Sequence, residues 1–337
     1  MVLKIQLFLS TFLPLSRFSL LVVLCAEFAR MITYHFKSVK DDSLQVFAEP
    51  RPGVWVDAVS PSQEEVDALT RDFGLDTTIL QDARDFFEVP RFERSGNAAY
   101  FFTRYLLDGD EEHADTAPIL IVVGESFVLT LVIAAAPFLE TFRNGARLVV
   151  TTQKTKLFLE FMKAIADEYG TELTRIRRSV NRARVDLRKI RNRNIERLVE
   201  YENALNDIAN ALVPTNAWLK QVLMGNFLQL FKEDVALVED LTIANNQLVD
   251  SATSILKASQ NIRSAHESIL TNNLNTAIRM LAAFTIILTI PMTISSLYGM
   301  NVALPFGENR FAFWYILGFI GVFMGAVWRY FSRKRWL

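Results

Sequence analysis

The sequence predicts an α/β cytoplasmic domain followed by long stalk helices and two C-terminal transmembrane helices. Three observations lead to this prediction. Short runs of β-branched and aromatic residues fill positions 31–135, helical stretches with few breakers follow, and two uncharged apolar runs, 280–307 and 311–328, come near the end. About 20 apolar helical residues span the roughly 30 Å hydrocarbon core of a bilayer. Each run can therefore hold one membrane span.

Composition excludes several classes of function. The chain has 337 residues and a net charge of −1, so bulk electrostatics give no reason to expect a nucleic-acid partner. The single cysteine, Cys25, excludes an intrachain disulfide, and the three histidines lack the spacing of a zinc site. No nucleophile–base set, phosphate loop or metal-ligand cluster is present. We therefore expect neither an enzyme nor a cofactor.

Residues 1–30 are apolar, but Lys4 and Arg17 interrupt them. A secretory signal needs an apolar core followed by a cleavage site of small residues. Glu27 follows the most apolar stretch instead, and a strand-like pattern starts at Met31. We interpret 1–30 as an over-extended reading frame and Met31 as the native start.

Residues 31–150 are predicted to form the cytoplasmic α/β domain, because their apolar runs have the composition and spacing of strands. The expected strands are 32–36, 44–47, 54–58, 98–107, 118–123 and 127–133. A helix is expected after Ser60, with Pro61 at the first helical position and Gln63 as capping-box partner. Helices and short turns both join the strands, which favours a sheet with helices packed on it.

Residues 151–279 are predicted to form a long helical hairpin and stalk. One helix is expected over 155–212, where Pro214 stops it and Asn216 caps the next, and no further proline occurs before Pro291. At about 1.5 Å per residue the second helix would be of order 100 Å long. Its apolar residues recur in a near-heptad pattern that predicts packing against other helices. They are Val235, Val238, Leu241, Leu248, Ile255, Ile262 and Ile269.

Cations crowd the segment 175–197 of the hairpin. They are Arg175, Arg177, Arg178, Arg182, Arg184, Arg188, Lys189, Arg191, Arg193 and Arg197. A nucleic-acid interface and a solvated helix face are both compatible with this pattern. We favour the solvated face, because aromatic residues do not alternate with the cations. The acids expected to pair with them are on the stalk: Glu233, Asp234, Glu239 and Asp240.

Positive charge at the C-terminus predicts the membrane topology. The second span, 311–331, is followed by the basic tail 332–337, and cations beside a span favour the cytoplasmic side. With two spans, the domain before the first span (280–298) is cytoplasmic too. The loop 299–310 then lies outside. The expected location is the cytoplasmic membrane of the cell.

One face of the first span is small and hydroxylated. It carries Asn275, Ile278, Ala282, Thr285, Thr289, Met292 and Ser296. Such a stripe indicates either a helix interface, with each hydroxyl bonded to its own helix, or a water-filled path. On the residues alone neither is favoured. Pro291 is expected to kink this helix and free a carbonyl.

Conduction would require several copies of the chain, because two spans cannot enclose a pore. Neither span holds a carboxylate, and Mg²⁺ gives up its water reluctantly. A ring of Asn301 amide oxygens at the outer mouth would accept hydrogen bonds from the hydration shell of an ion. Gly299 is expected to let the backbone turn sharply beside it.

The sequence Tyr298-Gly299-Met300-Asn301 follows a proline-containing span and precedes a second span with a basic tail. This order resembles the CorA family of divalent-cation (magnesium/cobalt) transporters, and the similarity extends back to Met31. The resemblance implies a homopentameric funnel in the cytoplasmic membrane that mediates influx of Mg²⁺, and often of Co²⁺ and Ni²⁺.

The resemblance also implies roles for individual residues. Gly299, Met300 and Asn301 would form the outer selectivity filter. The pore would be lined by Asn275 at its inner end and by an apolar gate at Ile278 and Leu281 or Ala282. Helical spacing adds Thr285, Thr289 and Met292 to the lining.

Two further features concern the binding of cations. Asp82 and Asp240 resemble the acids with which the family senses cytoplasmic Mg²⁺ between subunits, so Mg²⁺ would be a regulatory ligand as well as a substrate. The alternative is that both are surface carboxylates. Glu308, the one acid of the outer loop, would attract cations.

Two other functions stay open. A zinc transporter of the same superfamily would share this architecture. A membrane-anchored sensor with a long stalk would use the spans without conducting, and it would tolerate replacement of Asn301.

Overall fold

The computed structural model describes residues 31–107, 115–147, 149–185, 192–225, 228, 230–301, 310–334 and 336. The interpretation of residues 1–30 concerns a segment outside the described residues. The chain divides into two compact units, one reaching Asn261 and the other covering 262–337.

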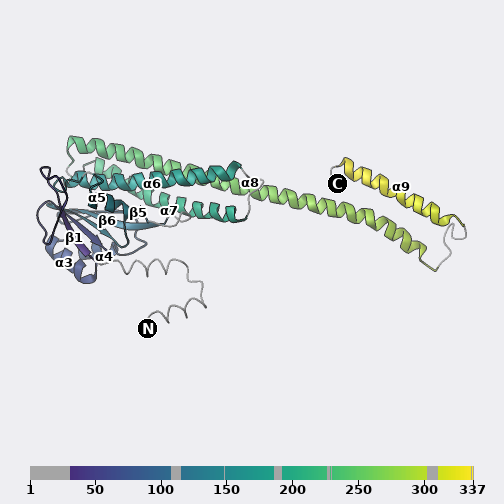
Figure 1. Cartoon of the computed structure of the whole chain (residues 1–337), viewed down its shortest axis with the longest axis horizontal. Helices are drawn as coiled ribbons and strands as arrows, with labels where there is room; N and C mark the ends of the chain where they lie inside the picture. Colours follow the sequence, from purple (N-terminus) through teal and green to yellow (C-terminus); the bar gives the residue numbers. More distant parts are fainter. Residues whose placement is uncertain are drawn as a thin grey trace, which may run out of the picture. The chain divides into compact units, whose positions relative to one another are not determined.

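A seven-stranded sheet forms the centre of the first unit, in the order β2-β1-β3-β7-β6-β5-β4 (Figure 1). The strands are β1 (Met31–Phe36), β2 (Gln45–Phe47), β3 (Val54–Val59), β4 (Phe92–Ser95), β5 (Ala98–Leu106), β6 (Thr116–Val123) and β7 (Phe127–Val132). All six predicted strands are confirmed, and β4 was missed. Only β3 and β7 pair in parallel, and the other pairs are antiparallel.

Helices cover both faces of the sheet. On one face α3 (Gln63–Phe73) and α4 (Thr77–Asp82) bury Leu69 and Leu80 against Val56 and Leu129. On the other face the ring of Trp55 lies 6.5 Å from that of Phe142 in α5 (Pro137–Arg143). Because β3 is central and covered on both sides, five of its six residues are buried.

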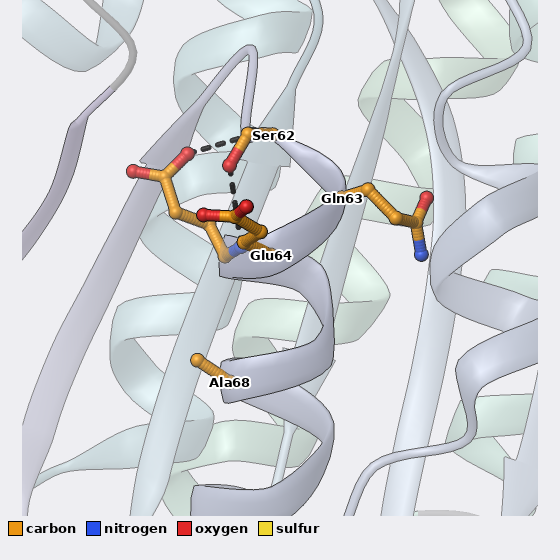
Figure 2. Close-up of a pocket in the computed structure, with 5 residues that line it drawn as sticks. Ser62, Gln63, Glu64 and Ala68 are labelled. Carbon is orange, nitrogen blue, oxygen red and sulfur yellow. Dashed lines mark hydrogen bonds between the residues drawn. The ribbon is translucent and has the colours of Figure 1, made fainter.

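The start of α3 differs from the prediction. Ser62 is the N-cap: its hydroxyl accepts from the backbone N–H of Glu65, whose carboxylate accepts from the backbone N–H of Ser62 at 2.7 Å. Ser60 instead stays with the sheet and donates its N–H to Val132 at 2.6 Å. Gln63 is therefore not the capping-box partner, and its side chain points away from Ser62 (Figure 2). The charged carboxylate of Glu65 is the stronger acceptor.

Four long helices follow: α6 (Lys154–Val185), α7 (Asn192–Leu223), α8 (Lys232–Tyr298) and α9 (Ala312–Arg333). Packing of the near-heptad positions is confirmed in the first unit, where Val238, Leu241 and Ile255 of α8 are buried.

The predicted stop at Pro214 is wrong, because Pro214 lies inside α7. Side chains hydrogen-bond to the carbonyls on its N-terminal side. Thr215 donates to Ala211 at 2.8 Å, and Asn245 of α8 donates to Leu212 at 2.9 Å. Side-chain donors thus satisfy carbonyls of the turn before Pro214, where proline disturbs the backbone hydrogen bonds.

The predicted pairing with stalk acids is also wrong for the described arginines Arg177, Arg178 and Arg182 of α6, whereas residues 186–191 lie outside the described residues. Helices α6 and α8 run in the same direction in the first unit, with Arg177 donating to Ser251 at 2.6 Å. Residues 233–240 of α8 therefore lie level with the start of α6, not with its arginines. Among the described residues, no ion pair joins Arg177, Arg178 or Arg182 to a carboxylate.

A buried polar cluster connects β1, β3, β7 and α5. The Asp57 carboxylate is 2.6 Å from the Arg143 guanidinium and accepts from the Thr130 hydroxyl at 3.1 Å, while Trp55 donates to Thr130 at 2.9 Å. His35 stacks on Trp55, with ring centroids 4.7 Å apart, and its Nε2 is 3.9 Å from Asp57. Burial, helped by the positive charge of Arg143, lowers the pKa of His35 to about 4.

Acidification should therefore destabilise the first unit through His35. The depressed pKa keeps His35 neutral in the folded chain, so its contribution is complete above about pH 6.5 and is lost as the pH falls toward 4. Between pH 7 and pH 5 we expect a loss of about 2 kcal/mol that His35→Phe abolishes. Urea unfolding of the detergent-solubilised chain, followed by tryptophan fluorescence, measures the difference. Equal pH dependence in both proteins would contradict this assignment.

Candidate functional site

The second unit contains the C-terminal part of α8 and α9. These are the two helices, among the residues described, that are long and apolar enough to cross a membrane. Ala283 and Ile287 of α8 pack against Phe331, with Met324 and Val327 of α9 beside them. This contact defines which face of α8 is covered within one chain.

The predicted pore-lining stripe is on the other face of α8. At about 100° per residue, Ile278, Thr285 and Met292 lie roughly opposite Ala283 and Ile287. Met292 is 75% exposed and Ile278 is 54% exposed. The remaining members, Asn275, Leu281 and Thr289, are also exposed, and Ala282 is half-buried. The structure therefore brings the predicted lining residues together on one uncovered surface.

The hydroxyl groups on this face are bonded to their own helix. Thr285 donates to the carbonyl of Leu281 at 2.8 Å, and Thr289 donates to that of Thr285 at 2.7 Å. The helix-internal bonding considered from the sequence is therefore present. It also has a chemical consequence, because a hydroxyl whose proton is committed offers only lone pairs to its surroundings. This face accepts hydrogen bonds and does not donate them through these threonines.

The Gly299-Met300-Asn301 segment follows directly on α8. Gly299 donates its N–H to Ser295 at 3.0 Å, and Met300 donates to Leu297 at 3.3 Å, so the segment closes the last turn of the helix. Gly299 does not have a positive φ. The turn that begins at Gly299 therefore does not use the left-handed backbone conformation that favours glycine. Asn301 is exposed at the end of the closed turn.

The predicted sensor acids are in different settings. Asp82 ends α4, and its carboxylate is 2.7 Å from the Arg91 guanidinium of the segment before β4. Asp240 is exposed on α8. No hydrogen bond or ion pair of the described residues joins the two, and no group of three potential metal ligands occurs among those residues. Glu308 lies outside the described residues.

Arg91 is a residue that the sequence reasoning missed. Its guanidinium contacts Asp82, Glu88 and Glu93, and it lies 4.1 Å from the ring centroid of Phe102. The acids Glu88 and Glu93, three and two residues from Arg91 in the sequence, were the available signal. One guanidinium thus contacts three carboxylates at this corner and compensates only part of their negative charge.

Replacement of Arg91 should leave the mutual repulsion of Asp82, Glu88 and Glu93 uncompensated. We expect Arg91→Gln to lower the free energy of unfolding by about 1 kcal/mol, because the three acids are partly solvated. Added Mg²⁺ should restore stability more in the variant than in the wild type. Thermal unfolding with and without Mg²⁺ measures both effects. Arg94→Gln, on an exposed β4 residue, is the control, and an equal loss there would exclude a specific role for Arg91.

Gly299→Ala should leave the protomer folded. A Cβ at Gly299 would be 3.4 Å from the carbonyl oxygen of Ser295 and 3.5 Å from that of Ser296, which is ordinary contact. Because alanine favours helix over glycine, we expect thermal stability within about 1 kcal/mol of wild type. A large drop in the melting temperature would show that this position is sterically closed within one chain.

Known proteins resemble this chain over most of its length. The model of a family described as CorA-like Mg²⁺ transporter protein matches residues 52–335. A cobalt/magnesium transport protein CorA from Methanocaldococcus jannaschii is 25% identical over 302 residues, which are 84% of this chain and 91% of that protein.

Solved structures share the fold. The complete structure of the CorA magnesium transporter from Methanocaldococcus jannaschii has a TM-score of 0.81 at 20% identity, covering 92% of this chain and 99% of that one. The cytoplasmic domain of ZntB from Vibrio parahaemolyticus has a TM-score of 0.59 at 9% identity, covering 72% of this chain and 99% of that one.

Proposed function

The chain belongs to the CorA-like family of Mg²⁺ transporters, and from this membership we propose that it mediates influx of hydrated Mg²⁺ across the cytoplasmic membrane. The family consists of transporters and not enzymes. Transport of divalent cations is the common function, and the location in the cytoplasmic membrane fits the two apolar C-terminal helices. The choice of Mg²⁺ and the route of the ion are the finer parts of the proposal.

The observation that carries the proposal is the uncovered face of α8. It has no charged side chain from Met280 to Asn301. Its threonine hydroxyls are committed donors, so they present acceptors. The water ligands of a cation donate hydrogen bonds outward, and Mg²⁺ keeps several of them. An acceptor-rich, uncharged wall therefore suits a hydrated cation better than a bare one.

The assembly is part of the same proposal. One chain leaves this face open, so several copies must surround the axis for a sealed path. We infer a homopentamer, as the resemblance implies, with one α8 from each copy. Asn301 from each copy would then form the outer ring. Gly299 and Met300 would shape the backbone beside it.

Selectivity and regulation extend the proposal. Co²⁺ and Ni²⁺ are expected as further substrates. Asp82 and Asp240 would bind regulatory Mg²⁺ between neighbouring copies, in which case the ion must compete with Arg91 for Asp82. Glu308 would attract cations to the mouth. Zinc transport is the weaker alternative, because the ZntB likeness is lower than the CorA likeness and concerns the fold alone.

Flux through the purified protein tests the proposal. Wild type in liposomes should take up Mg²⁺, and cobalt hexaammine, a mimic of hydrated Mg²⁺, should block that uptake. Asn301→Ala should lower the uptake by about tenfold or more, because a ring of acceptors is lost. Asn273→Ala is the matched control, since Asn273 is exposed on α8 outside the predicted stripe.

Each other result has a distinct meaning. Flux of Zn²⁺ without Mg²⁺ would transfer the assignment to the zinc branch. Absence of flux for either ion, in correctly inserted oligomers, would favour the non-conducting sensor. Equal loss in Asn273→Ala would contradict a specific role for Asn301.

A further inference from the structure

An open groove of about 970 Å³ runs between α6 and α8 in the first unit. The helices approach closely at its floor, where a Cβ on Gly170 would be 3.6 Å from the side chain of Leu248. Ala166 and Ala244 also line it, so small residues on both helices keep the floor narrow. The groove is lined by residues that come well before the membrane-spanning part of α8 in the sequence, and it shares no residue with the predicted pore lining.

The walls of the groove are strongly basic. Arg175, Arg177, Arg178 and Arg182 line it, and Asp167 is the only acid among the described lining residues. Asp167 is already paired with Arg147 at 2.8 Å. Along α6 the arginines extend from 175 to 182, about 10 Å of helix at 1.5 Å per residue.

Three of these guanidinium groups have no carboxylate partner among the described residues. Arg175 is neutralised by Glu172 at 2.6 Å. Arg177 instead donates to Ser251, and Arg182 donates to Ser179 at 3.2 Å. Arg178 is exposed. Like charges crowded on one helix repel one another, so a bound anion would stabilise this arrangement.

The groove offers donors but few competing acids. Thr171 and Thr174 donate to carbonyls of α6, at 3.0 and 2.9 Å, so they give no protons to a ligand. The arginines supply the N–H groups, and Gln247 adds an amide. Arginine binds phosphate with two parallel hydrogen bonds, which an extended row of guanidiniums can repeat along a chain of phosphates.

We propose that this groove binds a phosphate-bearing polyanion of the triphosphate class, held by Arg177, Arg178 and Arg182. A soluble triphosphate and the headgroups of anionic lipids share this chemistry. The chain of phosphates lies along α6, and the close contact at Gly170 forms the floor beneath it. Binding here is independent of whether the chain conducts ions.

The test uses the full chain in nanodiscs of zwitterionic lipid, with inorganic tripolyphosphate as the probe and a chelator to remove divalent cations. Isothermal titration calorimetry should show saturable binding that weakens as salt rises, because phosphate contacts release counterions. The double variant Arg178→Ala/Arg182→Ala should weaken binding by about tenfold or more. Arg184→Ala, an exposed arginine of α6 outside the groove, should bind as wild type does.

Contrary outcomes are equally clear. No binding by the wild type would overturn the proposal, as would an equal loss in Arg184→Ala, which would indicate a diffuse charge effect. Circular dichroism of each variant excludes misfolding as the cause of a loss.

A second set of nanodiscs, which contains anionic lipid, identifies the source of the bound anion. Weakened tripolyphosphate binding in these nanodiscs supports a lipid headgroup in the groove. Unchanged binding supports a soluble anion. Neither result depends on Mg²⁺ flux, so a failed transport assay and a failed binding assay are distinguishable.

Discussion

The buried ion pair of Asp57 and Arg143 is the constraint on which the first unit depends. A carboxylate taken out of water is costly unless it is paired and hydrogen-bonded. Asp57 lies on the central strand β3, so its requirement for Arg143 fixes α5 against the sheet, and its bond to Thr130 fixes the parallel register of β3 and β7. Burial raises the pKa of Asp57, and Arg143 opposes that rise. Loss of Arg143 would leave a buried, unpaired acid at the centre of the sheet.

The two units provide partners for their buried polar groups in different ways. The first unit has buried charges and pairs them, as at Asp57. The second has no charge along the uncovered face of α8 and directs its hydroxyl protons back to the helix. The Arg143 ion pair and the helix-internal threonine bonds each give a polar group a partner in a dry environment. The helix-internal bonds also leave the face of α8 able to accept hydrogen bonds, which is the property that the proposed transport of a hydrated cation would require.

Much of this structure was predictable from the sequence, for physical reasons that differ between elements. Buried strands such as β6 have continuous β-branched runs, and the membrane helices lack charge, so both were found. Strand β4 was missed because Phe92–Ser95 is a short edge strand with alternating polar residues. The helix end predicted at Pro214 was wrong because hydrogen bonds from the side chains of Thr215 and Asn245 stabilise the helix around this proline. Asp82 meets Arg91 only through the fold, and the sequence neighbours Glu88 and Glu93 are the only local signal of this cluster. Asn301 was identified by its family motif, whereas the proposed ring of Asn301 side chains would require other copies of the chain.

The sheet topology also has a consequence for biogenesis. Strands β4 to β7 are neighbours both in the sequence and in the sheet. Strand β3, by contrast, can pair with β7 only after β7 has left the ribosome, which is much later in synthesis. Non-local pairing of this kind slows folding. The whole sheet is nonetheless synthesised before the first membrane-spanning segment, and domains generally fold in the order in which they are made. The soluble domain can therefore close on the cytoplasmic side during translation, before insertion of the apolar helices commits the chain to the membrane.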